Sequence, residues 1–209
     1  MRIVGLTGQI GTGKSTVSRW LEAYGVVAID SDALVRQLYD GDAALHAQLQ
    51  GRFGRQVVRS GSVDKAALGA AVFSDTQALT DLEAIVHPVV RRLRDQQVEE
   101  ARRRGVQACA VEAIKLVESG GSDICDELWI VVAGERVQFE RLAGRGMAEA
   151  EARRRLAAQG TVASWSEQFL AESTRLDRTR PIVIFDNSGA EEVGKAQVKR
   201  LWEGVCAAP

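Results

Sequence analysis

One segment near the start of the chain constrains the fold more than any other. Residues 8–15 read Gly-Gln-Ile-Gly-Thr-Gly-Lys-Ser, a complete G-x-x-x-x-G-K-S pattern. An apolar run at 3–6 precedes it, and apolar residues at helical spacing follow it as far as Gly25. A strand, a glycine-rich turn and a helix in this order are typical of a phosphate-binding loop. Because both flanks fit, we favour this interpretation over a glycine turn that binds nothing.

The residue types of the loop suit a polyphosphate. Gly8, Gly11 and Gly13 allow backbone N–H groups to turn inward, and a helix that begins near Lys14 adds unpaired N–H groups and a partial positive charge. Lys14 would reach the β- and γ-phosphates, and Ser15 would offer its hydroxyl to Mg²⁺. The sequence therefore predicts a site for a polyphosphate with its magnesium ion.

The composition narrows the class of protein. The chain has 209 residues, 45% of them hydrophobic and 26% charged, which suits one buried α/β core with a smaller appended lobe. The formal net charge of −1 gives no global attraction to nucleic acid or to an anionic membrane. The three cysteines form no C-x-x-C pair, which argues against a structural zinc site and a secreted disulfide framework. We expect a cytoplasmic protein, since no leader precedes the first strand and no apolar run is long enough to span a membrane.

Apolar runs predict the strands of a parallel sheet. They lie at 3–6, 26–29, 108–112, 128–133 and 182–185, and helical stretches separate them. This alternation favours a doubly wound, five-stranded α/β fold with right-handed crossovers.

Helical patterns fill the long stretch between the second and third strands. We expect helices at 43–53, 65–73 and 79–86, followed by a long helix that Pro88 opens. A charged helical region is expected over 135–159. The long helical insert could recognise a second substrate.

Polar residues follow the strands, at the edge of the sheet where open α/β folds bind ligands. Asp30 and Asp32 follow the second strand, Glu112 ends the third, and Asn187 follows the last. Asp32 is our candidate for orienting an acceptor hydroxyl or accepting its proton, in preference to a role as a helix cap. Glu112 either holds a Mg²⁺-bound water or pairs with Lys115, and the sequence leaves both interpretations open.

Short segments beyond the loop carry a resemblance that spans nearly the whole chain. In order, they lie at 5–8, 30–32, 85–88, 118–119, 125–126, 138–145 and 153–159. Their sequence, order and spacing resemble those of dephospho-coenzyme A kinases, a family of the P-loop kinase superfamily.

The resemblance implies an activity and a division of the chain. Members of this family transfer the ATP γ-phosphoryl group to the ribose 3′-hydroxyl of dephospho-coenzyme A, the last step of coenzyme A biosynthesis. The resemblance implies a single domain with a core at 1–31, 105–134 and 180–209, a helical substrate lobe at about 32–104 and a lid at about 135–160.

The loop and the resemblance together give the candidate site residues. Those expected to bind ATP are Gly8, Gly11, Thr12, Gly13, Lys14, Ser15, Thr16, Arg141, Arg145 and Asn187, with Ser15 also a ligand of Mg²⁺. Those expected to bind the acceptor are Asp32, His87, Glu112 and Lys115. Those expected to take part in catalysis are Lys14, Asp32 and the lid residue Arg145.

The chain departs from the family pattern at a few places. Gln9 stands where another glycine is usual, but this position is variable in the loop motif, so phosphate binding need not suffer. Ile114 and Lys115 replace a proline and a leucine, which leaves the shape of that wall of the site open. Arg180 and Pro181 stand where alanine and aspartate are usual, and the sequence offers no interpretation of this change.

Other classes of protein remain as alternatives. A nucleoside or nucleoside-monophosphate kinase would share the loop, lid and sheet and would differ mainly in the helical insert. A GTPase switch would need a guanine-specific N-K-x-D segment, which the chain lacks. We expect dephospho-coenzyme A as the small-molecule partner, no nucleic-acid or membrane partner, and a monomer, with an oligomer left open.

Overall fold

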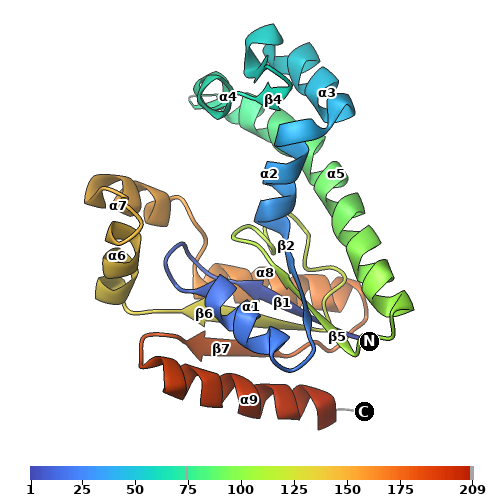
Figure 1. Cartoon of the computed structure of the whole chain (residues 1–209), viewed down its shortest axis with the longest axis vertical. Coiled ribbons are helices and arrows are strands. Elements are labelled where there is room, and N and C mark those ends of the chain that lie inside the picture. Colours follow the sequence, from blue (N-terminus) through green and yellow to red (C-terminus); the bar gives the residue numbers. More distant parts are fainter. Residues whose placement is uncertain (74, 208–209) are drawn as a thin grey trace. The chain divides into compact units, whose positions relative to one another are not determined.

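The computed structural model, which describes residues 1–73 and 75–207, contains a five-stranded parallel sheet. The strands are β1 (Arg2–Thr7), β2 (Val27–Asp30), β5 (Ala108–Glu112), β6 (Glu127–Val132) and β7 (Ile182–Asp186). They lie in the order β2-β5-β1-β6-β7, and each neighbouring pair is parallel (Figure 1). The strands and the doubly wound α/β fold expected from the sequence are confirmed.

Helices connect the strands and also build a separate insert. They are α1 (Lys14–Glu22), α2 (Ser31–Gly41), α3 (Ala43–Phe53), α4 (Lys65–Val72), α5 (Thr76–Arg103), α6 (Glu135–Ala143), α7 (Glu149–Ala157), α8 (Val162–Arg175) and α9 (Glu191–Ala207). A 3₁₀ turn at Arg55–Val57 leads into a short antiparallel hairpin of β3 (Val58–Arg59) and β4 (Ser62–Val63). Helices α1 and α9 cover one face of the sheet, and α8 lies behind the other face (Figure 1).

The chain divides into two compact units. The first contains residues 1–30 and 100–209, which include the sheet and the phosphate loop, and the second contains residues 31–99. The second unit holds α2, α3, α4, the hairpin and most of α5. The site described below lies within the first unit.

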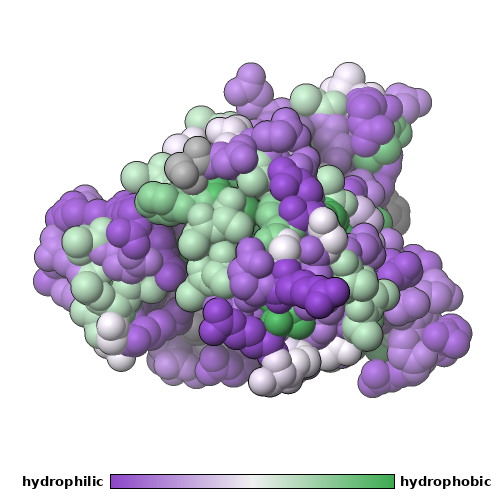
Figure 2. Space-filling model, turned by 90° about the horizontal axis from the view of Figure 1, so that it is seen from above, coloured by the Kyte–Doolittle hydropathy of each residue, from purple (hydrophilic) through white to green (hydrophobic). Residues whose placement is uncertain are grey.

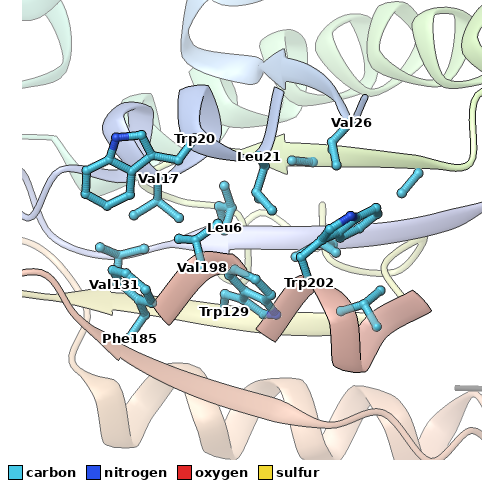
Figure 3. Packing of buried hydrophobic residues seen from close by; sticks show 14 residues of the cluster. Leu6, Val17, Trp20, Leu21, Val26, Trp129, Val131, Phe185, Val198 and Trp202 are labelled. Carbon is cyan, nitrogen blue, oxygen red and sulfur yellow. The ribbon is translucent and has the colours of Figure 1, made fainter. Parts of the chain in front are cut away.

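Side chains on both faces of the sheet are buried, as the continuous apolar run of β6 predicts. Successive residues of a strand point to opposite faces, so Trp129 and Val131 join the core under α1 and α9, while Leu128 and Ile130 face the other way. The large members of the core cluster (Figure 3) include Trp20, Leu21, Phe185, Val198 and Trp202. Burying one large apolar side chain stabilises the fold by about 1.5–3 kcal/mol, so this layer holds the helix after the phosphate loop firmly in place.

Pro88 does not open a helix, and that prediction is wrong. Helix α5 runs without a break over Thr76–Arg103, with His87 and Pro88 inside it. A proline inside a helix loses one hydrogen bond to the carbonyl four residues earlier. Val86 and Val90, on either side of it, are buried, and their packing stabilises helical structure through the proline.

The sequence analysis did not identify helix α8. Its start is fixed by a capping box, in which the Thr161 side chain accepts from the Ser164 N–H while the Ser164 hydroxyl accepts from the Thr161 N–H. Trp165 and Phe169, four residues apart, are fully buried on one side of the helix. The capping pair and this spacing are the sequence signals that could have revealed it.

The charged region at 135–159 is helical, as predicted, and forms the two helices α6 and α7. Much of the surface seen in Figure 2 is hydrophilic, with hydrophobic residues interspersed. Within residues 1–73 and 75–207, no helix is both long enough and apolar enough to cross a membrane.

Candidate active site

The loop between β1 and α1 has a backbone that only glycine fits well. Gly8 and Gly13 have φ angles of 148° and 92°, in the region that favours glycine. A Cβ atom on Gly8 would collide with the carbonyl oxygen of Val131, and one on Gly13 would collide with the side-chain amide of Asn187. The loop is therefore packed closely against the end of β6 and the turn after β7.

Side chains from distant segments hold the backbone of this loop. The Arg141 guanidinium donates to the carbonyls of Thr12 at 3.0 Å and Gly11 at 3.3 Å, and to the carbonyl of Asn187 at 2.7 Å. The Asn187 side chain also donates to the Thr12 carbonyl, at 2.8 Å. Both residues therefore support the loop in this structure, and their direct contact with ATP stays a prediction.

The start of α1 is built to receive an anion. Its N-cap is Gly13, which has no side chain to satisfy the first N–H groups of the helix. The Lys14 ammonium lies on the loop itself, where it donates to the Gly8 carbonyl at 2.8 Å and the Gln9 carbonyl at 3.4 Å. Ser15 and Thr16 follow in the first turn. The predicted phosphate-binding residues are thus gathered at one helix end.

Glu112 is a buried carboxylate beside this helix end. Its Oε1 accepts from the Ser15 hydroxyl at 2.9 Å, while its Oε2 is buried and has no hydrogen-bond partner among the described residues. Asp30 stands opposite it on the neighbouring strand. Burial raises the pKa of Glu112, and the charge of Asp30 adds to this rise, whereas the Ser15 and Ser18 hydroxyls and the Lys14 charge lower the pKa. The ionised form of Glu112 is therefore disfavoured by its surroundings, and a cation beside the carboxylate would stabilise that form.

Ser15 and Glu112 fit a magnesium ion. An unpartnered carboxylate oxygen and a hydroxyl are hard oxygen ligands, which Mg²⁺ prefers. In the described parts of the chain, no group of three or more His, Cys, Asp or Glu side chains is placed to hold a metal. A site with one or two protein ligands is what Mg²⁺ uses when substrate phosphates and water supply the rest.

The other predicted residues lie in segments outside the phosphate loop and the first turn of α1. Arg145 is exposed between α6 and α7, and its guanidinium makes no hydrogen bond or ion pair with any described residue. Lys115 is exposed in the segment after β5. Asp32 lies in the first turn of α2, and His87 lies within α5, both in the second unit. The roles of these residues stay predictions.

A pocket of about 390 Å³ opens beside the loop. The end of β6 and the start of α8 supply most of its apolar lining, and Gln9, Thr12 and Gln138 supply polar groups. A mostly apolar hollow with a few polar groups is typical of small-molecule sites.

Two glutamines that the sequence analysis gave no role also contact the loop. The Gln138 side chain donates to the carbonyl of Ile10 at 3.1 Å, and the Gln159 side chain accepts from the N–H of the same residue at 2.8 Å. Both glutamines lie in segments that carry the family resemblance, which is the signal that could have pointed to them.

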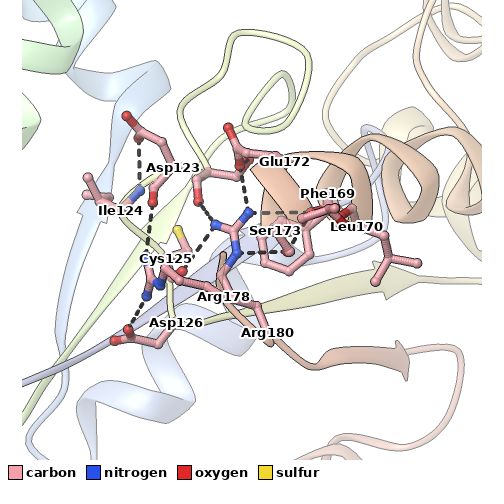
Figure 4. Close-up of polar contacts among 12 residues, drawn as sticks. Asp123, Ile124, Cys125, Asp126, Phe169, Leu170, Glu172, Ser173, Arg178 and Arg180 are labelled. Carbon is pink, nitrogen blue, oxygen red and sulfur yellow. Dashed lines mark hydrogen bonds and ion pairs between the residues drawn. The ribbon is translucent and has the colours of Figure 1, made fainter. Parts of the chain in front are cut away.

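Arg180, which the sequence left without interpretation, is buried on the α8 side of the sheet (Figure 4). Its guanidinium donates to the Ser173 hydroxyl and the Ser122 carbonyl, each at 2.8 Å, and to the Glu172 carboxylate at 3.0 Å. The guanidinium carbon also lies 4.1 Å from the centre of the Phe169 ring. Arg180 therefore joins α8 to the segment before β6.

Comparison with known sequences agrees with this arrangement. A family model for dephospho-CoA kinase matches residues 2–178. A dephospho-CoA kinase of Geobacter sulfurreducens is 37% identical over 204 residues, which cover 97% of this chain and 98% of that relative. A dephospho-CoA kinase of Symbiobacterium thermophilum is 40% identical over 208 residues, which cover 99% of this chain and 82% of that relative.

Solved structures show the same fold. TT1252 from Thermus thermophilus matches with a TM-score of 0.72 at 30% sequence identity, covering 99% of this chain and 96% of that one. A dephospho-CoA kinase from Campylobacter jejuni matches with a TM-score of 0.63 at 18% identity and 98% coverage of both chains, which supports the fold. With the phosphate loop, the parallel sheet and these full-length relatives in agreement, the chain belongs to the dephospho-CoA kinase family.

Proposed function

We propose that this protein transfers the γ-phosphoryl group of ATP to the ribose 3′-hydroxyl of dephospho-coenzyme A, giving coenzyme A and ADP. Family membership supports the reaction. The observation that carries the nucleotide half is the placement of Lys14 and Ser15 at one helix end beside the buried carboxylate of Glu112. Phosphoryl transfer asks mainly for alignment and charge neutralisation, which such a cluster can supply.

Lys14 and the loop would bind the phosphates. The Lys14 ammonium now donates to loop carbonyls, and its flexible stem allows it to exchange these acceptors for phosphate oxygens. Arg141 and Asn187 hold the loop carbonyls from the other side, so the loop keeps its shape when Lys14 turns away.

Ser15 and Glu112 would hold Mg²⁺, Ser15 through its hydroxyl and Glu112 through a bound water. The bound ion would neutralise charge on the β- and γ-phosphate oxygens. Oε2 of Glu112 is buried without a hydrogen-bond partner in the described chain, so this oxygen is available to accept from a Mg²⁺-bound water.

Asp32 would act on the acceptor. We propose that its carboxylate orients the ribose 3′-hydroxyl and accepts the proton as the oxygen bonds to the γ-phosphorus and the bond to the ADP oxygen breaks. Asp30 ends β2 beside Glu112, and Asp32 follows two residues later in the first turn of α2. His87 and Lys115 are further proposed contacts with the acceptor.

The division of labour along the chain is also a proposal. Residues of about 32–104 would form the acceptor lobe, and residues of about 135–160 would form a lid over the phosphates, with the rest as the nucleotide core. Arg145 suits the lid role because its guanidinium, unengaged by any described residue, is exposed between α6 and α7.

A coupled ADP-release assay tests the proposed function. We expect turnover with dephospho-coenzyme A and none above background with a panel of nucleosides and nucleoside monophosphates, which the alternative kinase hypothesis would favour. Lys14→Ala and Asp32→Asn should each lower kcat by about a thousandfold or more, because one removes charge from the phosphates and the other removes the proton acceptor. ATP affinity measured by calorimetry should fall for Lys14→Ala and stay near that of the parent for Asp32→Asn.

Two results would count against this proposal. If a nucleoside were phosphorylated faster than dephospho-coenzyme A, the nucleoside and not dephospho-coenzyme A would be the acceptor. A near-parental rate for Asp32→Asn would remove Asp32 from the chemistry while leaving the nucleotide site intact.

A further inference from the structure

Two glutamines tie the phosphate loop to the end of α7. The side-chain oxygen of Gln159 accepts from the N–H of Ile10 at 2.8 Å. The side-chain amide of Gln9 donates in the opposite direction, to the carbonyls of Gly160 at 3.3 Å and Leu156 at 3.4 Å. Each glutamine thus binds the backbone of the segment that carries the other, although the segments are about 150 residues apart in the chain.

A second tie runs from α6 to the same loop. Gln138 donates to the Ile10 carbonyl at 3.1 Å, and Arg141 donates to loop carbonyls beyond it. The proposed lid, residues 135–160, is therefore bonded to the loop near both of its ends. Arg145 lies between these ends and is exposed.

Gln9 occupies a variable position of the loop motif, and only its side chain supplies the donor for this tie. A glycine, which the family usually has there, would offer no side-chain amide. The carbonyl of Gln9 accepts from the Thr12 hydroxyl at 2.9 Å and from the Lys14 ammonium at 3.4 Å. Holding Gln9 in place therefore also restrains the Thr12 hydroxyl and the Lys14 ammonium, which donate to its carbonyl.

We propose that Gln9 and Gln159 are positioning residues for nucleotide binding, which together order the first half of the phosphate loop against the end of the proposed lid. A loop that is ordered before the ligand arrives spares the complex the entropy cost of ordering it. The proposal rests on the proposed nucleotide site but not on the identity of the acceptor.

The junction between α7 and α8 does not need this tie to stay in place. The indole N–H of Trp165 donates to Glu118 at 2.7 Å, and Gly160 packs so closely on Trp165 that a Cβ would collide with the ring. Trp165 itself is 1% exposed. Removing the glutamine contacts should therefore loosen the loop without unfolding the junction.

Methionine variants test the tie, because methionine keeps the length of glutamine and removes its donor and acceptor. We expect Gln9→Met and Gln159→Met each to weaken Mg-ADP binding, measured by calorimetry, by about three- to tenfold, the loss of one or two net hydrogen bonds. Both side chains join the same two segments, so their effects should not add. We expect the double variant to bind Mg-ADP within about twofold of the single variant that has the lower affinity. KM for ATP should rise in parallel, while kcat at saturating ATP stays within about twofold.

Gln168→Met is the matched control, since Gln168 is exposed on α8. Its ADP affinity should equal that of the parent. Amide exchange followed by NMR should show the Ile10 N–H exchanging about tenfold faster in Gln159→Met and unchanged in the control.

Parental ADP affinity in both Gln9→Met and Gln159→Met would overturn the proposal, and so would unchanged exchange of the Ile10 N–H in Gln159→Met. If the parent itself failed to bind Mg-ADP, the nucleotide site would fall, and the positioning role with it. If instead the parent bound Mg-ADP and used another acceptor, the positioning role would stand while the proposed reaction failed.

Discussion

Glu112 and Arg180 are both buried charged residues of the same unit, but their surroundings differ. Arg180 is 3% exposed and donates to a hydroxyl, a carboxylate and backbone carbonyls. Glu112 is 5% exposed, has one oxygen without a described partner, and stands beside the like charge of Asp30. All three guanidinium nitrogens of Arg180 donate hydrogen bonds, whereas only one of the two carboxylate oxygens of Glu112 has a hydrogen-bond partner among the described residues.

This difference separates a structural charge from a functional one. A buried ion that is fully hydrogen-bonded holds its neighbours together, and removing it leaves them unpaired. A buried ion that the fold leaves unsatisfied lowers stability until a ligand arrives, which is common where side chains serve binding or catalysis. Changing Glu112 is therefore expected to lower activity and raise stability, whereas changing Arg180 is expected to lower stability and leave activity nearly unchanged.

Between these two residues, the larger effect is expected for Glu112→Gln. The amide keeps the size of the side chain and an acceptor for the Ser15 hydroxyl but removes the charge that would hold a Mg²⁺-bound water. We expect kcat to fall by about a hundredfold or more. The free energy of unfolding without metal should rise by about 1 kcal/mol, because the buried charge beside Asp30 is gone. Steady-state assays and chemical denaturation measure the two changes.

Glu127→Gln is the matched control for this change. Glu127 begins β6, and burial raises its pKa as it does for Glu112, but its carboxylate accepts from the Trp129 indole at 2.6 Å. The control should keep parental kcat within about twofold. Loss of activity in both variants would show that buried charge in general, and not a metal role, explains the result for Glu112.

The next largest effect is expected for Arg180→Met, and it should act on stability. Without the guanidinium, the Glu172 carboxylate keeps only the Ser122 hydroxyl as a donor among the described residues, and the Ser122 carbonyl keeps only the Cys125 N–H. We expect the free energy of unfolding to fall by about 3 kcal/mol and Tm to fall by roughly 6–12 °C for a chain of this size. The kcat of the folded protein should stay within about threefold of the parent, measured well below Tm.

Arg178→Met supplies the contrast. Arg178 donates to Asp126 at 2.7 Å, but 38% of its side chain is exposed, and exposed ion pairs contribute about 1 kcal/mol or less. A loss of stability as large as that of Arg180→Met would remove the distinction between a buried hub and a surface pair.

The sequence predicted a functional role for Glu112 but offered no interpretation of Arg180. The five strands were predictable because long apolar runs mark parallel strands covered on both faces, and the phosphate loop was predictable because its motif fixes a local geometry. Glu112 was recognised at a strand end, but sequence proximity suggested Lys115 as an alternative partner. Its observed partner is Ser15, 97 residues away.

The remaining gaps have physical reasons. The hydrogen bonds that hold the loop, such as that of Asn187 to Thr12, join residues up to 175 positions apart, and no local pattern encodes them. The hairpin of β3 and β4 has strands of two residues, too short to show a period of two. Pro88 was misjudged because a local rule about proline was applied where packing on both sides holds the helix together.

The smallest expected effect is the pH dependence of the difference in stability between the parent and Glu112→Gln. Because the pKa of Glu112 is raised on folding, the folded protein holds its proton at pH values where the unfolded chain has lost it. The free energy of unfolding must therefore fall as pH rises from about 4.3, the ordinary pKa of glutamate, up to the raised pKa in the folded state. The glutamine of Glu112→Gln does not titrate. The free energies of unfolding of the parent and the variant should therefore be most alike at low pH, and that of the parent should fall below that of the variant as pH rises. Denaturation of both proteins without metal between pH 4 and 8 should show a difference that grows with pH to about 1 kcal/mol and then levels off, and a difference that stays constant with pH would mean that Glu112 is charged at no cost. Adding Mg-ADP should shrink or reverse the difference, since the ionised carboxylate of the parent then has the partner that the fold leaves out.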